Sequence, residues 1–290
     1  MRTIMTSIAL AGISILLAPK CEAGDRSIGV IGEYRPAAAR LVLKRAPDGR
    51  EIPIRIGTIV AAEDSVTLPA GASVVVQLAS GERKQFSGAG TFQMPKSNTL
   101  GTLARFFESI SSLFDDEYRL EGTAASRGAE QCDENATVDS MEIPLLAHGA
   151  SMTAGTRDLP LAWTAGCGPF QVELWSASKG SLVRERTTEH RLRLDAIPFE
   201  IGDHRVTIID SRGRKIERVL TVVDQAPRMP SDLANDTSAL GTIAQAIWLA
   251  EQDGGRWRIE SFDRLRPLIR GGNELAGAIG DGVLWGMARD

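Results

Sequence analysis

Short apolar runs with an alternating pattern, separated by turn residues, fill two long stretches of this 290-residue chain. The first covers residues 27–94, where runs such as 52–56 and 74–78 are separated by Pro-Asp-Gly, Pro-Ala-Gly and Ala-Ser-Gly-Glu segments. Glycine supplies a positive φ and proline presets φ, so these segments favour tight turns between strands. The pattern predicts an all-β module, which we bound at residues 24–96.

A second series of strand-length runs extends from residue 141 to residue 223, and an Asp-Ser-Arg-Gly turn at residues 210–213 precedes the last of them. This spacing predicts a sandwich of about seven strands over residues 141–226. The stretch resembles an immunoglobulin-like or fibronectin type III module, in which an early strand ends in Trp and a late one has an apolar-x-Gly-x-aromatic pattern. Trp163 and the segment Ile201-Gly202-Asp203-His204 stand at those places here. His204 stands where that family usually has the Tyr of its corner hydrogen bond.

The order of parts in the first stretch also resembles a known family. Gly57, an apolar run and Asp64 are followed by an apolar strand pair around Gly81, as in the periplasmic FecR-type β domain. The resemblance implies a FecR-like fold and a relation to envelope signalling. FecR-type regulators also carry a cytoplasmic segment that holds a sigma factor. Only residues 1–3 precede the apolar leader here, so we expect that segment to be missing.

The N-terminus indicates export. Residues 4–18 carry no charge, and the run is shorter than the roughly 20 apolar residues that span a bilayer. Cys21 and Ala23 are the small residues that a signal peptidase reads, so we expect a signal peptide over residues 1–23, and an uncleaved anchor is the alternative. Both interpretations place the bulk of the chain outside the cytoplasm, in the periplasm or secreted.

The cysteine count fits an oxidising compartment. Cys21 leaves with the signal peptide, and Cys132 and Cys167 remain. An even pair in an exported protein predicts one disulfide between the two.

A helix is predicted between the two β stretches. Residues 97–118 have helical apolar spacing, and residues 119–140 are rich in small and polar residues, as linkers are. The helix either packs on a β module or presents a docking surface. Its candidate interaction residues are Leu103, Phe106, Phe107, Ile110 and Phe114.

The C-terminal residues 227–290 favour a helical hairpin. Asp236 can cap the first helix, the Asp-Gly-Gly segment at residues 253–255 ends it, and a second helix ends near Pro267. A third apolar stretch contains Gly277 and Gly280, which makes it a weaker helix. The predicted fold class is therefore mainly β: a FecR-like domain and an immunoglobulin-like sandwich, with an amphipathic helix between them and a C-terminal helical hairpin.

The sequence offers little for catalysis or metal binding. Its imidazoles are His148, His190 and His204, and none lies in a catalytic motif or has the spacing of a metal site. A net charge of −4, which becomes −5 without residues 1–23, disfavours nucleic acid. We therefore expect no catalytic, cofactor or metal residues.

The resulting hypothesis is a non-catalytic adaptor or ligand-binding protein of the cell envelope, whose partner is an envelope protein or polymer. Envelope signalling related to FecR-type regulators is one alternative. A weak cell-wall hydrolase is another. We expect no nucleic-acid partner and no stable membrane span after signal cleavage.

Overall fold

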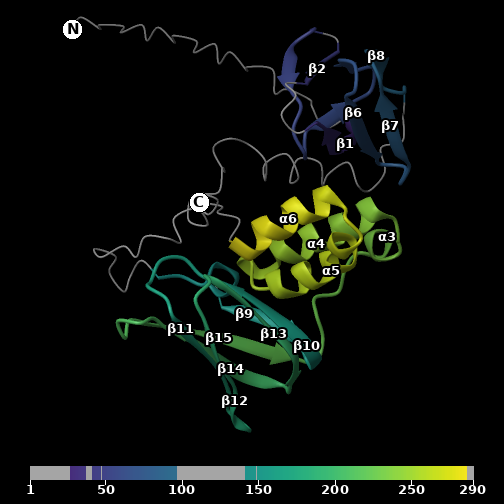
Figure 1. The fold of residues 1–290 in the computed structure, drawn as a ribbon. Helices are drawn as coiled ribbons and strands as arrows, with labels where there is room; N and C mark the ends of the chain where they lie inside the picture. The colour runs from purple at the N-terminus through teal and green to yellow at the C-terminus, as the bar shows by residue number, and fades with distance from the viewer. Residues whose placement is uncertain (1–26, 37–40, 47, 97–140, 148, 286–290) are drawn as a thin grey trace, which may run out of the picture.

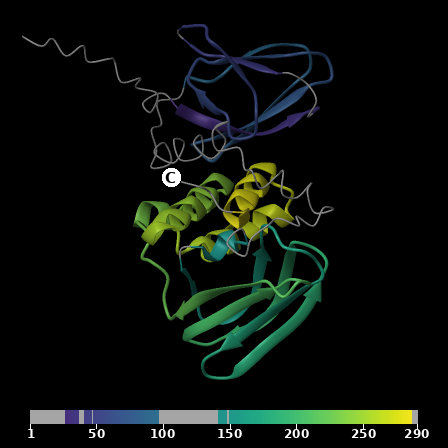
Figure 2. The same ribbon diagram turned by 90° about the vertical axis from the view of Figure 1, so that its left-hand side faces the viewer.

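The computed structural model describes residues 27–36, 41–46, 48–96, 141–147 and 149–285. Two β parts are joined by helices that lie between them, and the two views agree on this order (Figures 1 and 2). The signal peptide predicted over residues 1–23, the helix predicted over residues 97–118 and the linker predicted over residues 119–140 lie outside the described residues. The fold is mainly β with a C-terminal helical part, in agreement with the predicted class.

The N-terminal part is all-β, as predicted. Its strands are β1 (Ser27–Arg35), β2 (Val42–Lys44), β3 (Glu51–Pro53), β4 (Ile59–Ala61), β5 (Ser65–Leu68), β6 (Ser73–Leu78), β7 (Arg83–Ser87) and β8 (Gly90–Gln93). They form two four-stranded sheets, in the orders β4-β1-β6-β7 and β3-β2-β5-β8. Ile31, Leu43, Val66 and Val74 are fully buried. Burial alternates along β5, because a strand turns every second residue toward the same face, whereas consecutive side chains are buried along most of β1 and β6.

The second β part has the seven strands expected of a sandwich. They are β9 (Ala150–Thr153), β10 (Gly155–Ala162), β11 (Phe170–Ser176), β12 (Gly180–Thr187), β13 (Arg191–Phe199), β14 (Gly202–Ile209) and β15 (Lys215–Val223), and a short 3-10 helix, η4 (Pro144–Leu146), precedes them. One sheet has the order β12-β11-β14-β15-β9, and the other pairs β10 with β13. The predicted turn at residues 210–213 is confirmed, since the N–H of Gly213 donates to the carbonyl oxygen of Asp210 at 3.0 Å.

Two aromatic contacts organise the sandwich core. The ring of Trp163, the residue after β10, is fully buried and meets Phe170 edge-on, with ring centroids 5.2 Å apart. His204 is also buried. Its Nδ1 lies 3.2 Å from the carbonyl oxygen of Gly202, and its ring contacts Phe199.

The C-terminal part contains more than the predicted hairpin. It comprises α3 (Ser231–Ala234), α4 (Ala239–Glu251), the 3-10 helix η5 (Gln252–Gly254), α5 (Arg258–Arg270) and α6 (Glu274–Trp285). The cap of α4 is Ser238, whose Oγ accepts the N–H of Gly241 at 2.9 Å, and Asp236 accepts the N–H of Ser238 instead. The predicted end of α4 at residues 253–255 is confirmed, because Asp253 and both following glycines have a positive φ.

The end of α5 corrects the sequence interpretation, and the weaker helix expected at the third apolar stretch forms as α6. Pro267 lies inside α5, which continues to Arg270, because Leu268 and Ile269 still pack against the core and offset the missing N–H. Gly280 lowers the helix propensity of α6 but lets α5 come close. A Cβ at Gly280 would lie 2.7 Å from Cδ1 of Ile269.

The helices share one hydrophobic core with both β parts. A single cluster of buried side chains contains Val30 of β1, Met152 of β9, Ile259 of α5 and Ile279 of α6. Glu274 of α6 also pairs with Arg35 of β1 at 3.8 Å. Within the described part of the chain, no helix is both long enough and apolar enough to cross a bilayer.

Candidate functional site

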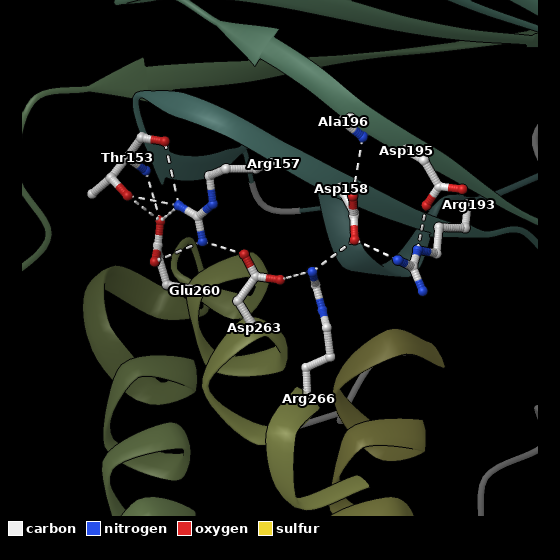
Figure 3. Close-up of polar contacts among 9 residues, drawn as sticks. All are labelled: Thr153, Arg157, Asp158, Arg193, Asp195, Ala196, Glu260, Asp263 and Arg266. Atoms are coloured by element: carbon white, nitrogen blue, oxygen red, sulfur yellow. Dashed lines mark hydrogen bonds and ion pairs between the residues drawn. The ribbon is translucent and has the colours of Figure 1, made fainter. Parts of the chain in front are cut away.

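Charged side chains gather where α5 packs against one edge of the sandwich (Figure 3). The N–H of Ser151 in β9 donates to the carbonyl oxygen of Arg256 at 2.7 Å, which brings the start of α5 beside this strand. Glu260 and Asp263 are three residues apart and therefore lie on the same face of α5. That face meets a group of side chains that we call the ionic cluster: Thr153, Arg157, Asp158, Arg193, Asp195, Glu260, Asp263 and Arg266.

Arg157 of β10 holds both carboxylates of α5. Its guanidinium donates to Glu260, with Nη2 3.1 Å from Oε2, and also to Asp263. Thr153 adds two hydrogen bonds to the same carboxylate, because its N–H and its hydroxyl donate to Oε1 of Glu260 at 2.7 and 2.8 Å. The carboxylate of Glu260 is thus surrounded by donors from two strands.

Asp158, the next residue of β10, makes the second half of the cluster. Its Oδ2 accepts from Arg266 at 2.9 Å and from Arg193 of β13 at 2.5 Å. Its Oδ1 accepts the N–H of Ala196 at 3.0 Å. The register between β10 and β13 shifts at this point and Ala196 has a φ of 53°, so Asp158 closes a β-bulge on the neighbouring strand.

The surroundings of Glu260, Asp263 and Asp158 shift the pKa values of these carboxyl groups in different directions. Burial alone would raise the pKa of Glu260, but the bonds from Arg157 and Thr153 outweigh it and lower that pKa. Burial raises the pKa of Asp263, and the nearby arginines only partly offset this effect. The N–H of Ala196, followed by Arg193 and Arg266, lowers the pKa of Asp158.

The ionic cluster binds the sandwich to the helices. Its groups satisfy one another across β9, β10, β13 and α5, which is what a structural interface requires. Among the described residues there is no group of three or more His, Cys, Asp or Glu side chains placed to hold a metal ion. The cluster was not predicted from the sequence, although the acidic pair at residues 260 and 263 and the charges inside strand-forming residues 157–158 are the signals for it.

A second feature lies on the outer face of the five-stranded sheet. Trp175, Arg205 and Val219 occupy neighbouring positions across β11, β14 and β15, and we call them the exposed strip. Trp175 is 38% exposed and Val219 is 48% exposed. The guanidinium of Arg205 lies 4.8 Å from the centroid of the Trp175 ring, which is a cation–π contact.

The exposed strip carries large apolar side chains that are exposed, which are rare in the described part of the chain. Of the large apolar residues in the described part of the chain, only Trp175, Val219 and Ile201 are exposed, and Ile201 lies in the turn between β13 and β14. Trp248 and Trp257 of the C-terminal part do not add to this exposed surface. Trp257 is buried, with its Nε1 bonded to Asp253, and Trp248 packs against the shared core.

The predicted disulfide falls partly outside the described residues. Cys167 is buried and disulfide-bonded, and its N–H donates to Asp210 at 3.1 Å. Cys132 lies outside the described residues, so the pairing of these two cysteines stays a prediction. Outside them lie also the five predicted interaction residues: Leu103, Phe106, Phe107, Ile110 and Phe114.

The predicted histidines are not brought together into a site. His148 lies outside the described residues. His190 follows β12, where its Nε2 lies 3.1 Å from the carbonyl oxygen of Ala165, and His204 is in the core beside Phe199.

Comparison with known proteins gives only partial matches. No protein-family model matches the chain, and no curated protein sequence matches it. Among solved structures, CopC from Methylosinus trichosporium OB3b is similar at 19% identity, over 28% of this chain and 88% of that one, with a TM-score of 0.22. The fibronectin(III)-like modules of Clostridium thermocellum CbhA match at 17% identity, over 30% of this chain and 99% of that one, with a TM-score of 0.22.

Proposed function

We propose that this chain is a non-catalytic, exported binding protein of the cell envelope that holds its partner on the outer face of the five-stranded sheet. The observation that carries the proposal is the exposed strip of Trp175, Arg205 and Val219. Trp and Arg are the side chains that most often supply the binding energy of protein interfaces. A sheet also presents them on a fixed backbone, so little conformational entropy is lost on binding.

The packing of the helices leaves this face open. Their contacts with the sandwich involve β9, β10 and η4, whereas the strip lies on β11, β14 and β15. The helices also contact β1, so the N-terminal module and the sandwich are held on one support. We infer that this support sets the sandwich at a fixed distance from the N-terminal module.

Export and the FecR-like identity of the N-terminal module belong to the same proposal. The charge-free residues 4–18 support a signal peptide, and the order of Gly57, Asp64 and Gly81 supports the FecR relation. Envelope signalling is the second candidate function. The observation that favours it is the burial of Val30 in the core shared with the helices, which gives the N-terminal module a path to influence them.

The experiment compares two matched substitutions in the exported protein. Trp175→Ser removes the aromatic side chain at one end of the strip, and Ile201→Ser removes a more exposed apolar side chain outside it. Both variants should keep the wild-type thermal midpoint, because a surface change usually alters stability by no more than about 0.5 kcal/mol. We expect Trp175→Ser to lose a partner that cross-links to the wild type in envelope extracts, and Ile201→Ser to retain it.

An identical set of cross-linked partners for the wild type and Trp175→Ser would overturn the binding face. Loss of the same partner with both substitutions would also count against it, since the effect would then not be specific to the strip. Val219→Lys provides a second test at the other end of the strip and should behave like Trp175→Ser.

A further inference from the structure

The ionic cluster contains more negative than positive groups. Arg157, Arg193 and Arg266 face four carboxylates, those of Asp158, Asp195, Glu260 and Asp263. Arg193 and Asp195 are at the solvent side, with side chains 49% and 69% exposed, where water screens their charges. The excess negative charge is therefore felt most by the carboxylates on the inner side.

Glu260 and Asp263 form the crowded inner pair. Their side chains are only 13% and 15% exposed, they lie on one face of α5, and both bind the guanidinium of Arg157. One guanidinium balances one carboxylate. When two carboxylates share a buried position in this way, one of them binds a proton more readily than it would in water.

The hydrogen bonds decide which carboxylate that is. Glu260 accepts from Arg157 and from both the N–H and the hydroxyl of Thr153. Asp263 accepts from Arg157 and from Arg266, but Arg266 also donates to Asp158. Asp263 thus shares both Arg157 and Arg266 with another carboxylate. Its ionised form is therefore less stabilised than that of Glu260.

We propose that the ionic cluster is a pH-sensitive coupling between the sandwich and the C-terminal helices, in which Asp263 binds a proton in mildly acidic solution while Glu260 stays ionised. Protonation of Asp263 removes the excess negative charge of the inner pair. Arg157 then pairs with Glu260 alone, and Arg266 pairs with Asp158. The contact of α5 with β9 and β10 is strongest in this state.

The direction of each titration fixes the pH window. The pKa of Asp263 is raised by burial, so the folded chain binds this proton more tightly than the unfolded chain. Stability therefore rises as the pH falls toward the ordinary aspartate value of about 3.9. The pKa values of Glu260 and Asp158 are lowered, so the stability that these groups supply is present at higher pH and is lost in strong acid. The contact between the sandwich and the helices is therefore most stable at a pH that is low enough to protonate Asp263 and high enough to keep Glu260 and Asp158 ionised.

Two carboxylate-to-amide substitutions on the same helix face test the proposal. Unfolding of the wild type, Asp263→Asn and Glu260→Gln is measured by urea titration over the acidic to neutral range. As the pH falls, the wild type should gain stability relative to Asp263→Asn. Glu260→Gln should be less stable than the wild type at neutral pH, and this difference in the free energy of unfolding should shrink as the pH falls through the acidic range. Asp195→Asn, at the exposed side of the same cluster, is the control and should follow the wild type.

Direct titration of the wild type completes the test. The carboxyl carbon resonance of Asp263 should titrate with a midpoint above about 3.9, and that of Glu260 with a midpoint below about 4.3. This measurement needs no variant, so it decides the question even if a substituted chain fails to fold. A midpoint of Asp263 below about 3.9, a midpoint of Glu260 above about 4.3, or the same pH profile for Asp263→Asn and Glu260→Gln would overturn the proposal.

Discussion

Arg266 of α5 donates to the carboxylate of Asp158 in β10 at 2.9 Å, across 108 positions of the sequence. The same carboxylate accepts from Arg193 and from the N–H of Ala196 in β13. Asp158 therefore joins the two strands of the smaller sheet to the helices, and its loss affects three elements together.

We expect Asp158→Ala to lower the free energy of unfolding by about 2 kcal/mol, because hydrogen bonds to charged groups contribute roughly 1.5–3 kcal/mol. The substitution removes the acceptor of Ala196 and one partner of Arg266. Urea denaturation measures the change. Asp195→Ala, at an exposed carboxylate of the same cluster, should change stability by less than about 0.5 kcal/mol. Equal effects of the two substitutions would contradict this role of Asp158.

Asp64 has a comparable position in the N-terminal module. Its carboxylate is fully buried, binds Arg45 at 2.7 Å and accepts the N–H groups of Ala46 and Ala61. Asp64→Ala should cost about 3–5 kcal/mol, because it leaves a charge and buried donors without their acceptor. The exposed Glu51→Ala is the control for thermal unfolding. A loss of stability as small as that of Glu51→Ala would show that the module does not depend on the bonds that Asp64 accepts.

The glycines of α6 give a matched pair. A Cβ at Gly277 meets none of the described atoms within 4 Å, whereas a Cβ at Gly280 would lie 2.7 Å from Ile269. Gly277→Ala should stabilise the chain by roughly 0.5–1 kcal/mol through helix propensity. Gly280→Ala should lose that gain, because Ile269 must move. The difference in thermal midpoint between the variants tests the close packing of α5 and α6, and two equal gains would contradict it.

Asp210 predicts a loss of stability in acid. Burial opposes its ionisation, but the bonds from Arg214 and from three backbone N–H groups lower the pKa of this carboxyl. Its stabilising effect is thus present above about pH 3.9 and is lost as the pH falls through its folded-state value. Asp210→Asn should be less stable at neutral pH and show a shallower decline in acid, as measured by urea titrations at several pH values. An unchanged pH profile would exclude this contribution.

The disulfide predicted between Cys132 and Cys167 is tested by thiol labelling of the denatured, non-reduced protein from its native compartment. No label should be incorporated at either cysteine. In the chain-entropy model, a disulfide that closes this loop of 36 residues (132 through 167) contributes about 3–4 kcal/mol to the free energy of unfolding. Reduction should therefore lower the thermal midpoint. Two labelled cysteines would disprove the pairing.

The β parts were predictable because their signals are local. Alternation every second residue placed Val66 and Val172 on buried faces, and the Asp-Ser-Arg-Gly segment at residues 210–213 placed the last turn. The expected seven-strand count of the sandwich followed from the same spacing.

Long-range partners were not predictable in this way. Nothing in the local pattern pairs Arg157 with Glu260, because the two residues meet only through the packing of a late helix on an early strand. For α6, local propensity argued in the wrong direction, since Gly280 weakens an isolated helix but permits its contact with Ile269. The exposed strip also depends on strand register, which brings Trp175, Arg205 and Val219 into one row.

The hydrogen bond from Ser151 to the carbonyl oxygen of Arg256 has a consequence for where this chain can be divided. It covers the outer edge of β9, and an uncovered edge strand offers its backbone groups to other chains and promotes aggregation. A fragment that stops at residue 226 would bare this edge together with the apolar residues, such as Met152, that share a core with the helices. Such a fragment should self-associate, whereas one that extends to residue 285 should remain dispersed.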